Sequence, residues 1–191
     1  MRKIVFATGN ANKVKEIKAQ LPDSIELLSL KDIGCEEELP ENQDTLEGNA
    51  VEKAVYVYER YGVDCFSEDT GLQVDALNGE PGVYSARYAG ESKDSNKNMD
   101  KVLQGLEGVE DRKARFRTVI AIIEEGVIKQ FDGVVEGEIL KERSGSEGFG
   151  YDPIFKADAF DVSFAEVSIE QKNSVSHRGR AVKKLIEYLN Q

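Results

Sequence analysis

The sequence predicts an α/β protein built around a mixed β-sheet. Apolar runs of strand length alternate with amphipathic helical stretches in the first third of the chain, strands cluster after residue 114, and a helix closes the chain. Alternating strands and helices favour parallel pairing, whereas consecutive strands with short turns favour antiparallel pairing. No internal repeat or low-complexity linker interrupts the pattern, so we expect one domain over residues 1–191.

The first elements follow from apolar runs and helix stop signals. Residues 3–7 predict a buried strand, and residues 12–21 predict a short helix that ends before Pro22. Residues 25–28 predict a second strand. The acidic stretch 34–44 is expected to be irregular.

A longer helix is expected over residues 45–61. Asp44 is its candidate N-cap, and Gly62 is its C-terminal stop. Lys53 flanks the apolar stripe of this helix, so its amine either extends to water or points into a pocket. The stripe consists of Leu46, Ala50, Ala54, Val57 and Tyr61.

The second half of the chain is expected to be richer in strands. A short strand begins at residues 65–67, and apolar residues at helical spacing predict a helix over 94–106. An antiparallel meander follows, and a helix over 181–189 closes the chain. The expected strands of the meander are 115–123, 127–132 and 135–140.

Composition excludes several classes of protein. The net charge of −11 disfavours nucleic acid as a partner, because nucleic-acid backbones attract surplus Lys and Arg. No run approaches the roughly 20 apolar residues of a membrane span, and the first residues lack a signal-peptide core, so we expect no membrane partner and a cytoplasmic location. Cys35 and Cys65 lack metal or redox spacing and are expected to be reduced thiols.

Basic residues gather where two helices are expected to begin. The segments are Thr8–Lys13 and Lys172–Arg180, each with glycine and hydroxyl residues. A helix N-terminus already carries about half a positive charge, so cations there are disfavoured unless an anion lies between them. One such segment is compatible with solvated surface. Two in an acidic chain point to a polyphosphate ligand.

Two adjacent carboxylates, Glu68 and Asp69, follow the strand that begins at Cys65. Neighbouring carboxylates at the carboxyl end of a strand suit a hard divalent cation. The alternative is a polar turn, since Asp-Thr-Gly is good turn chemistry. The acidic loop before the long helix could add a ligand; its carboxylates are Glu36, Glu37, Glu38 and Glu41.

A glycine-rich segment over residues 145–153 surrounds Phe149. The glycines let the backbone approach a ligand and expose the ring as a platform for stacking a base; alternatively the ring packs in the core. His177, the only histidine, adjoins Arg178 in the second basic segment, where it either packs or donates hydrogen bonds to a ligand.

These residues together resemble the inosine triphosphate pyrophosphatase family, the noncanonical purine NTP (dITP/XTP) pyrophosphatases. The likeness covers nearly the whole chain and comes in the family's order. It rests on the segments Thr8–Lys13, Glu68–Leu72, Pro81–Tyr88, Phe149–Pro153 and Lys172–Arg178.

The resemblance implies an elongated, curved mixed β-sheet flanked by helices, in two lobes with a central cleft, and a homodimer. It implies hydrolysis of a purine nucleoside triphosphate between the α and β phosphates with Mg²⁺. Asp69 would bind metal and activate water, Thr70 would contact substrate, and Glu41 would be the other metal ligand, with Glu38 or Asp44 as alternatives. Phosphates would be held by Thr8, Gly9, Asn10, Ala11, Asn12, Lys13, Lys53 and Lys172. The base would be enclosed by Phe149, Gly150, Tyr151, Asp152, His177 and Arg178.

The residues alone leave two other functions open. Positioning and charge neutralisation dominate phosphoryl transfer, so the same groups could serve attack at the terminal phosphate or on modified pyrimidine triphosphates. The chain could also be a regulatory module that binds a nucleoside triphosphate without hydrolysing it.

Overall fold

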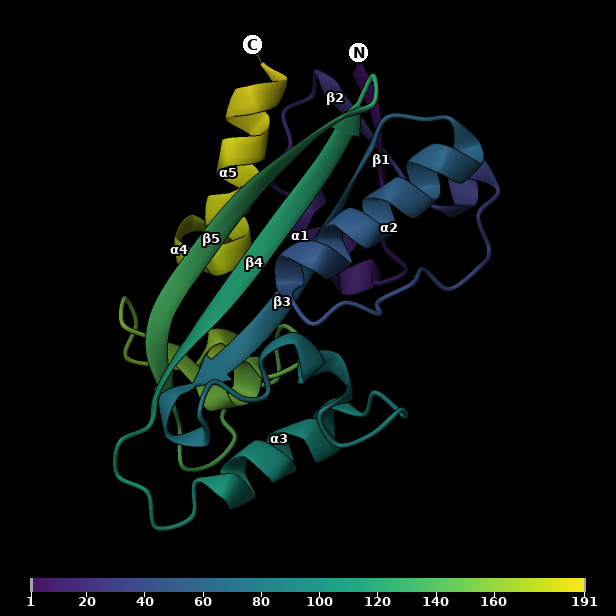
Figure 1. Cartoon of the computed structure of the whole chain (residues 1–191). Coiled ribbons are helices and arrows are strands. Elements are labelled where there is room, and N and C mark those ends of the chain that lie inside the picture. Colours follow the sequence, from purple (N-terminus) through teal and green to yellow (C-terminus); the bar gives the residue numbers. More distant parts are fainter. Residues whose placement is uncertain (1, 191) are drawn as a thin grey trace. The chain divides into compact units, whose positions relative to one another are not determined.

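The computed structural model describes residues 2–190, whose strands form one six-stranded sheet in the order β2-β1-β3-β4-β5-β6 (Figure 1). β1 pairs in parallel with β2 and β3, and β5 pairs antiparallel with β6. The predicted mixed α/β sheet is therefore confirmed. The strands are β1 (Arg2–Phe6), β2 (Ile25–Leu28), β3 (Cys65–Val74), β4 (Lys113–Glu124), β5 (Val127–Ile139) and β6 (Phe155–Ala157).

The predicted helices are present, with shifted ends. Asn10 caps the first helix, because its side chain accepts the N–H groups of Asn12 and Lys13. The second helix is capped by Thr45, whose hydroxyl accepts the Gly48 N–H at 3.0 Å, so the prediction of Asp44 was wrong. The helices are α1 (Ala11–Lys18), α2 (Leu46–Tyr61), α3 (Ser95–Gly105), α4 (Ile169–Val175) and α5 (His177–Leu189).

Two predicted strand ends were wrong for the same physical reason. β3 continues through Glu68 and Asp69 to Val74, and β5 runs unbroken where two strands were expected. Glycine next to Asp or Thr suggested turns, but extended pairing within the sheet overrides local turn preference. The hairpin between β4 and β5 lies where it was predicted, with positive φ at Glu125 and Gly126.

The last basic segment also differs from its prediction. Lys172 lies inside the short helix α4, and His177 is the first residue of α5, which therefore begins four residues before the predicted Ala181. Ser168 caps α4 by accepting the Gln171 N–H. Lys172 thus does not belong to the start of the closing helix.

The chain divides into two compact units. The first comprises the described residues up to Asp69, with 118–133 and 178–190. Its core joins strand residues to α1 and α5, and the Phe6 and Phe66 rings stack with centroids 4.6 Å apart. Helices α2 and α5 lie on opposite sides of its strands (Figure 1). Each buried phenylalanine contributes roughly 1.5–3 kcal/mol.

The second unit comprises Thr70–Arg117 and Val134–His177. Its core is centred on three aromatic rings: Phe155 lies 4.7 Å from Phe116 and 5.2 Å from Phe164, centroid to centroid. The predicted single bilobed domain with a central cleft stays a prediction.

Cys35 and Cys65 are both free, as predicted, and both are buried. Within residues 2–190 every helix is too short or too polar to cross a membrane.

Candidate active site

Strand β3 presents alternate side chains to its two faces, and the face toward α2 carries Ser67 and Asp69. The Ser67 hydroxyl donates to the Ala50 carbonyl of α2. Asn49, one residue earlier in α2, donates through Nδ2 to Asp69 Oδ2 at 3.1 Å. Because strand side chains alternate with period two, this face excludes Glu68. Asp69 therefore belongs to a site built from β3 and α2.

Lys53 links Asp69 to the acidic loop. Its Nζ lies 2.6 Å from Glu41 Oε1 and 3.5 Å from Asp69 Oδ1, and the side chain is only 6% exposed. Burial opposes the charge, but Asp69 and Glu41 raise the pKa of Lys53 above its ordinary value. The Lys53 amine thus points into a charged site and does not extend to water.

The negative charge of the buried Asp69 carboxylate is only partly offset by the positive charges around it. Burial raises the pKa of Asp69 above its ordinary value, and attraction from Lys53 and Lys13 offsets only part of that effect. A buried carboxylate with an elevated pKa binds a further cation or a proton readily. Such a group in a charged site is a candidate for catalysis.

The donor set of this site fits Mg²⁺. The carboxylates of Glu41 and Asp69 both approach one ammonium group, which shows that they can share a cation. Mg²⁺ is commonly held by one or two carboxylates, with waters and substrate phosphates completing its coordination. Glu41 and Asp69 would supply the two protein carboxylates of such a site, and residues 2–190 contain no group of three or more His, Cys, Asp or Glu side chains placed to hold a metal ion.

Glu68 faces the opposite side of β3 and is fully engaged there. Arg178 of α5 donates from Nε and Nη2 to the two Glu68 oxygens, each at 2.8 Å, and Lys13 Nζ lies 3.0 Å from Glu68 Oε1. Burial opposes the charge, but Arg178 and Lys13 hold the pKa of Glu68 well below its usual range. The expectation that Glu68 and Asp69 form a neighbouring pair at one metal was wrong, because consecutive strand residues point to opposite faces.

Sequence reasoning missed Glu16, a further partner of Arg178. Arg178 Nη1 donates to Glu16 Oε2 at 2.6 Å, and the Glu16 side chain is 4% exposed. Its position three residues after Lys13 in α1 was the available signal, because residues three apart share a helix face. The proposed role of Arg178 toward a base stays a prediction, with these nitrogens already donating to carboxylates.

The segment Thr8–Lys13 connects β1 to α1 beside Glu68. β1 runs parallel to β3 with Phe6 opposite Phe66, so the residues after Phe6 follow the carboxyl end of β1, where ligands commonly bind in α/β sheets. The Thr8 hydroxyl accepts the Asn10 N–H at 3.2 Å. The predicted basic helix start is confirmed, and its role in binding phosphate stays a prediction.

A second group of predicted site residues lies within the second unit. Lys172 Nζ is 2.6 Å from Asp152 Oδ2 and 5.0 Å from the centroid of the Phe149 ring. The Phe149 N–H donates to the same Asp152 oxygen at 2.8 Å. A Cβ on Gly148 would lie 2.1 Å from this oxygen, so the close approach requires glycine there. The structure thus groups Lys172 with residues predicted to hold the base.

The remaining predicted residues of the second unit have distinct surroundings. Phe149 is half-buried, in contrast to the buried core rings, and Tyr151 donates its hydroxyl to the Ser85 carbonyl at 2.7 Å. His177 is buried and stacks on Phe116, with centroids 4.7 Å apart. Thr70 is half-buried in β3, and Gly150 adopts a positive φ.

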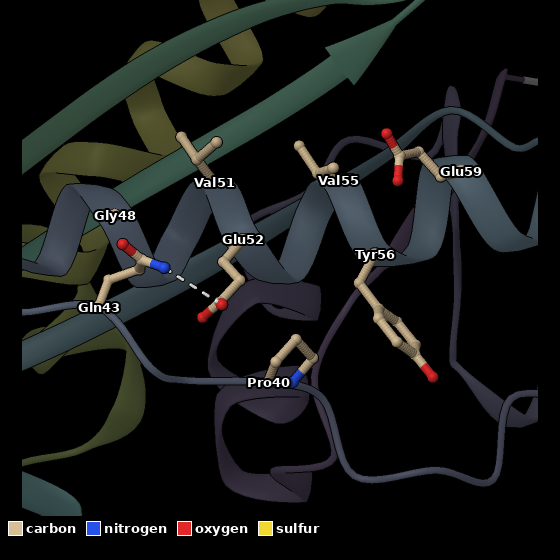
Figure 2. A pocket seen from close by; sticks show the side chains of 8 residues that line it. All are labelled: Pro40, Gln43, Gly48, Val51, Glu52, Val55, Tyr56 and Glu59. Carbon is tan, nitrogen blue, oxygen red and sulfur yellow. Dashed lines mark hydrogen bonds between the residues drawn. The ribbon is translucent and has the colours of Figure 1, made fainter.

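A groove along α2 is lined by none of the predicted site residues (Figure 2). Figure 2 shows Gln43 and Glu52 pointing toward each other, with Gln43 Nε2 donating to Glu52 at 3.2 Å. The Asn42 N–H also donates to Glu52, at 2.8 Å. Glu52 therefore fastens the end of the acidic loop to α2, next to Glu41. The groove is lined by Pro40, Gln43, Gly48, Val51, Glu52, Val55, Tyr56 and Glu59.

Comparison with known proteins gives one consistent result. Residues 4–188 match the model of the Ham1 family. The chain is 56% identical to the dITP/XTP pyrophosphatase of Flavobacterium johnsoniae, over 98% of this chain and 97% of that protein. It is 53% identical to the dITP/XTP pyrophosphatase of Christiangramia forsetii, over 98% and 99%. The solved structure of a HAM1 protein from Coxiella burnetii has a TM-score of 0.90 at 36% identity, covering 100% of this chain and 99% of that one.

Proposed function

Because the chain belongs to the Ham1 family, we propose that it hydrolyses noncanonical purine nucleoside triphosphates to the monophosphate and pyrophosphate, with Mg²⁺. Near full-length relatives named dITP/XTP pyrophosphatase support the substrate class. The observation that carries the chemistry is Asp69, a buried carboxylate with a raised pKa that shares the Lys53 ammonium with Glu41.

Each residue of the first unit then has a distinct task. Glu41 and Asp69 would hold Mg²⁺, which supplies charge neutralisation to the phosphates when bound. Asp69 orients the attacking water and accepts its proton, a role that a raised pKa favours and that typically contributes about 10²–10⁴-fold. Lys53 and the segment Thr8–Lys13 bind phosphate oxygens and offset their charge.

Base selection follows from hydrogen-bond polarity. Hypoxanthine and xanthine present a carbonyl at the 6-position, whereas adenine presents an amino donor there. The ammonium of Lys172 and the backbone N–H groups near Asp152 can only donate hydrogen bonds. Such donors can pair with the carbonyl of hypoxanthine or xanthine, but they would face another donor in adenine. A site that leaves polar groups unpaired can reject an analogue by up to about 10⁴–10⁵-fold. Phe149 supplies a surface on which the base stacks. Guanine also has a carbonyl at the 6-position, so this hydrogen-bond argument does not explain a rejection of GTP.

A product assay over a panel of triphosphates tests the proposal. With Mg²⁺, we expect ITP, dITP and XTP to give monophosphate and pyrophosphate, and ATP and GTP to react far more slowly. Orthophosphate as the first product would indicate attack at the terminal phosphate and would contradict the proposal. Equal rates on ATP and ITP would contradict the base selection. Binding of the nucleotide without turnover would favour the alternative, a regulatory module that binds nucleoside triphosphates.

The assembly and location belong to the same proposal. The family resemblance favours a homodimer located in the cytoplasm. Its expected partner is the nucleotide substrate, and we expect it to bind neither nucleic acid nor membranes. Light scattering on the purified chain should give twice the mass of 21.2 kDa, and cell fractionation should recover it with soluble proteins. A monomeric mass would contradict the homodimer.

A further inference from the structure

Asn49 joins the two segments that carry the proposed metal ligands. It lies in α2, one turn before Lys53, and is 1% exposed. Its Oδ1 accepts the Gln43 N–H at 2.9 Å, and its Nδ2 donates to Asp69 Oδ2 at 3.1 Å. One buried side chain therefore contacts both the acidic loop and β3.

The orientation of the Asn49 amide is fixed by its partners. A backbone N–H can only donate, so the atom facing Gln43 N must be the carbonyl oxygen. The other end is then the amino group, which meets a carboxylate oxygen that can accept. Flipping the amide would place two donors together at Gln43 and two acceptors together at Asp69. The hydrogen-bond network thus permits one orientation.

This orientation distinguishes the two oxygens of Asp69. Oδ2 accepts from Asn49, while Oδ1 faces the Lys53 ammonium at 3.5 Å, on the side of Glu41. At its other end, Asn49 holds the backbone of Gln43, two residues after Glu41. Loss of Asn49 would therefore remove one hydrogen bond from the carboxylate of β3 and one from the acidic loop at the same time.

We propose that Asn49 is a positioning residue for the hydrolysis: its amide turns Asp69 Oδ1 toward the site shared with Glu41 and fixes the loop that carries Glu41. The inference rests on the proposed function. Partners that orient metal ligands typically contribute about 10–100-fold to metal affinity or activity. Asn49 acts through Asp69 and Glu41 and does not need to touch the nucleotide.

The test compares Asn49→Ala with Val57→Ala, a buried position two turns further along α2 that supplies no polar contact to the site. Three quantities are measured: thermal stability, Mn²⁺ affinity by electron paramagnetic resonance without nucleotide, and steady-state kinetics on ITP. Asn49→Ala should weaken Mn²⁺ binding or lower kcat by about 10–100-fold, with a much smaller change in KM. Val57→Ala should lower thermal stability but leave both quantities near the parent's.

A second variant, Asn49→Asp, distinguishes the contribution of the hydrogen bond to Asp69 from that of the hydrogen bond to Gln43. It also keeps the inference testable if Asn49→Ala fails to fold. The Asp side chain is of similar size and still accepts the Gln43 N–H, but its carboxylate cannot donate to Asp69. We expect kcat to fall about as far as in Asn49→Ala, with the loop still anchored. Parental kcat in Asn49→Asp, or Mn²⁺ affinity and kcat in Asn49→Ala equal to those of Val57→Ala, would overturn the inference. Failure of the proposed function would instead appear in the parent's products.

Discussion

Glu68 and Asp69 are consecutive buried carboxylates of β3 with opposite electrostatic surroundings. Glu68 meets two nitrogens of Arg178 and the Lys13 ammonium, all within 3.0 Å. Asp69 meets the Asn49 amide at 3.1 Å and one ammonium, shared with Glu41, at 3.5 Å. The pKa of Glu68 is lowered and that of Asp69 is raised, although burial acts in the same direction on both.

This difference separates a structural carboxylate from a reactive one. Permanent cationic partners keep Glu68 charged and leave it little capacity for another ligand. Asp69 lacks full compensation, so a metal ion or a proton gains more by approaching it. The contrast also bears on Arg178, because Arg178→Ala would leave Glu68 and Glu16 buried without this partner. Arg178→Lys keeps the charge but cannot reproduce the two-nitrogen contact with Glu68, so either substitution would disturb this ion pair as well as any contact with the base.

The largest expected effect is the loss of turnover in Asp69→Asn. This substitution removes the charge without changing the size of the side chain, so kcat on ITP should fall at least about 10²–10⁴-fold. Thermal stability in chelator should not decrease, because the ionised Asp69 carboxylate is under-compensated in the fold. Turnover within tenfold of the parent would mean that the water is activated elsewhere.

Glu68→Gln is the matched substitution on the other face, and its main effect should be on stability. It removes the Glu68 charge that faces the buried Arg178 guanidinium, and breaking a buried pair typically costs about 3–5 kcal/mol. We expect the free energy of unfolding, measured in urea, to fall by that amount. Lys184→Met is the control, because its exposed pair with Asp132 should be worth about 0–1 kcal/mol. If Glu68→Gln and Lys184→Met lowered the free energy of unfolding equally, Glu68 would not have the structural role assigned to it.

Glu41→Gln should have a smaller, specific effect on metal binding. It removes one of the two carboxylates that share the Lys53 ammonium, so Mn²⁺ affinity should fall by about 10–100-fold, as for other changes around metal ligands. Glu38→Gln and Asp44→Asn change the charge of the same loop equally and should alter affinity much less. If either control weakened binding more than Glu41→Gln, that residue would replace Glu41 as the ligand.

The smallest expected effects are opposite pH dependences of stability. Glu68 has a pKa below its ordinary 4.5 in the fold, so its stabilisation is complete above that pH and is lost as pH falls further. Asp69 has a pKa above its ordinary 3.8, so its ionisation lowers stability as pH rises through the folded value. Urea unfolding from pH 3 to 8, in chelator, should show the deficit of Glu68→Gln shrinking in acid. The gain of Asp69→Asn over the parent should instead grow toward neutral pH, and parallel curves would argue against the assigned pKa directions.

The sequence by itself determined many of the local elements and pointed to the residues of the candidate site. Apolar runs placed β1 and β2, and the stop at Gly62 ended α2 where it was expected, with φ of 63°. The basic start of α1 was also predictable, because caps and helix periodicity depend on residues close in sequence. Asp69, Glu41 and Lys53 were named together through family resemblance, and the structure brings them into one group.

Only the tertiary structure decided which partners these residues have. Arg178 reaches Glu68 across 110 positions and Glu16 across 162, and such pairs depend on how α1 and α5 pack on one face of β3. Local turn chemistry gave no sign that β3 would continue, and hence that Glu68 and Asp69 would point apart. The role of Asn49 was hidden for the same reason: an amide in a helix becomes a bridge only when a loop and a strand are both packed against it.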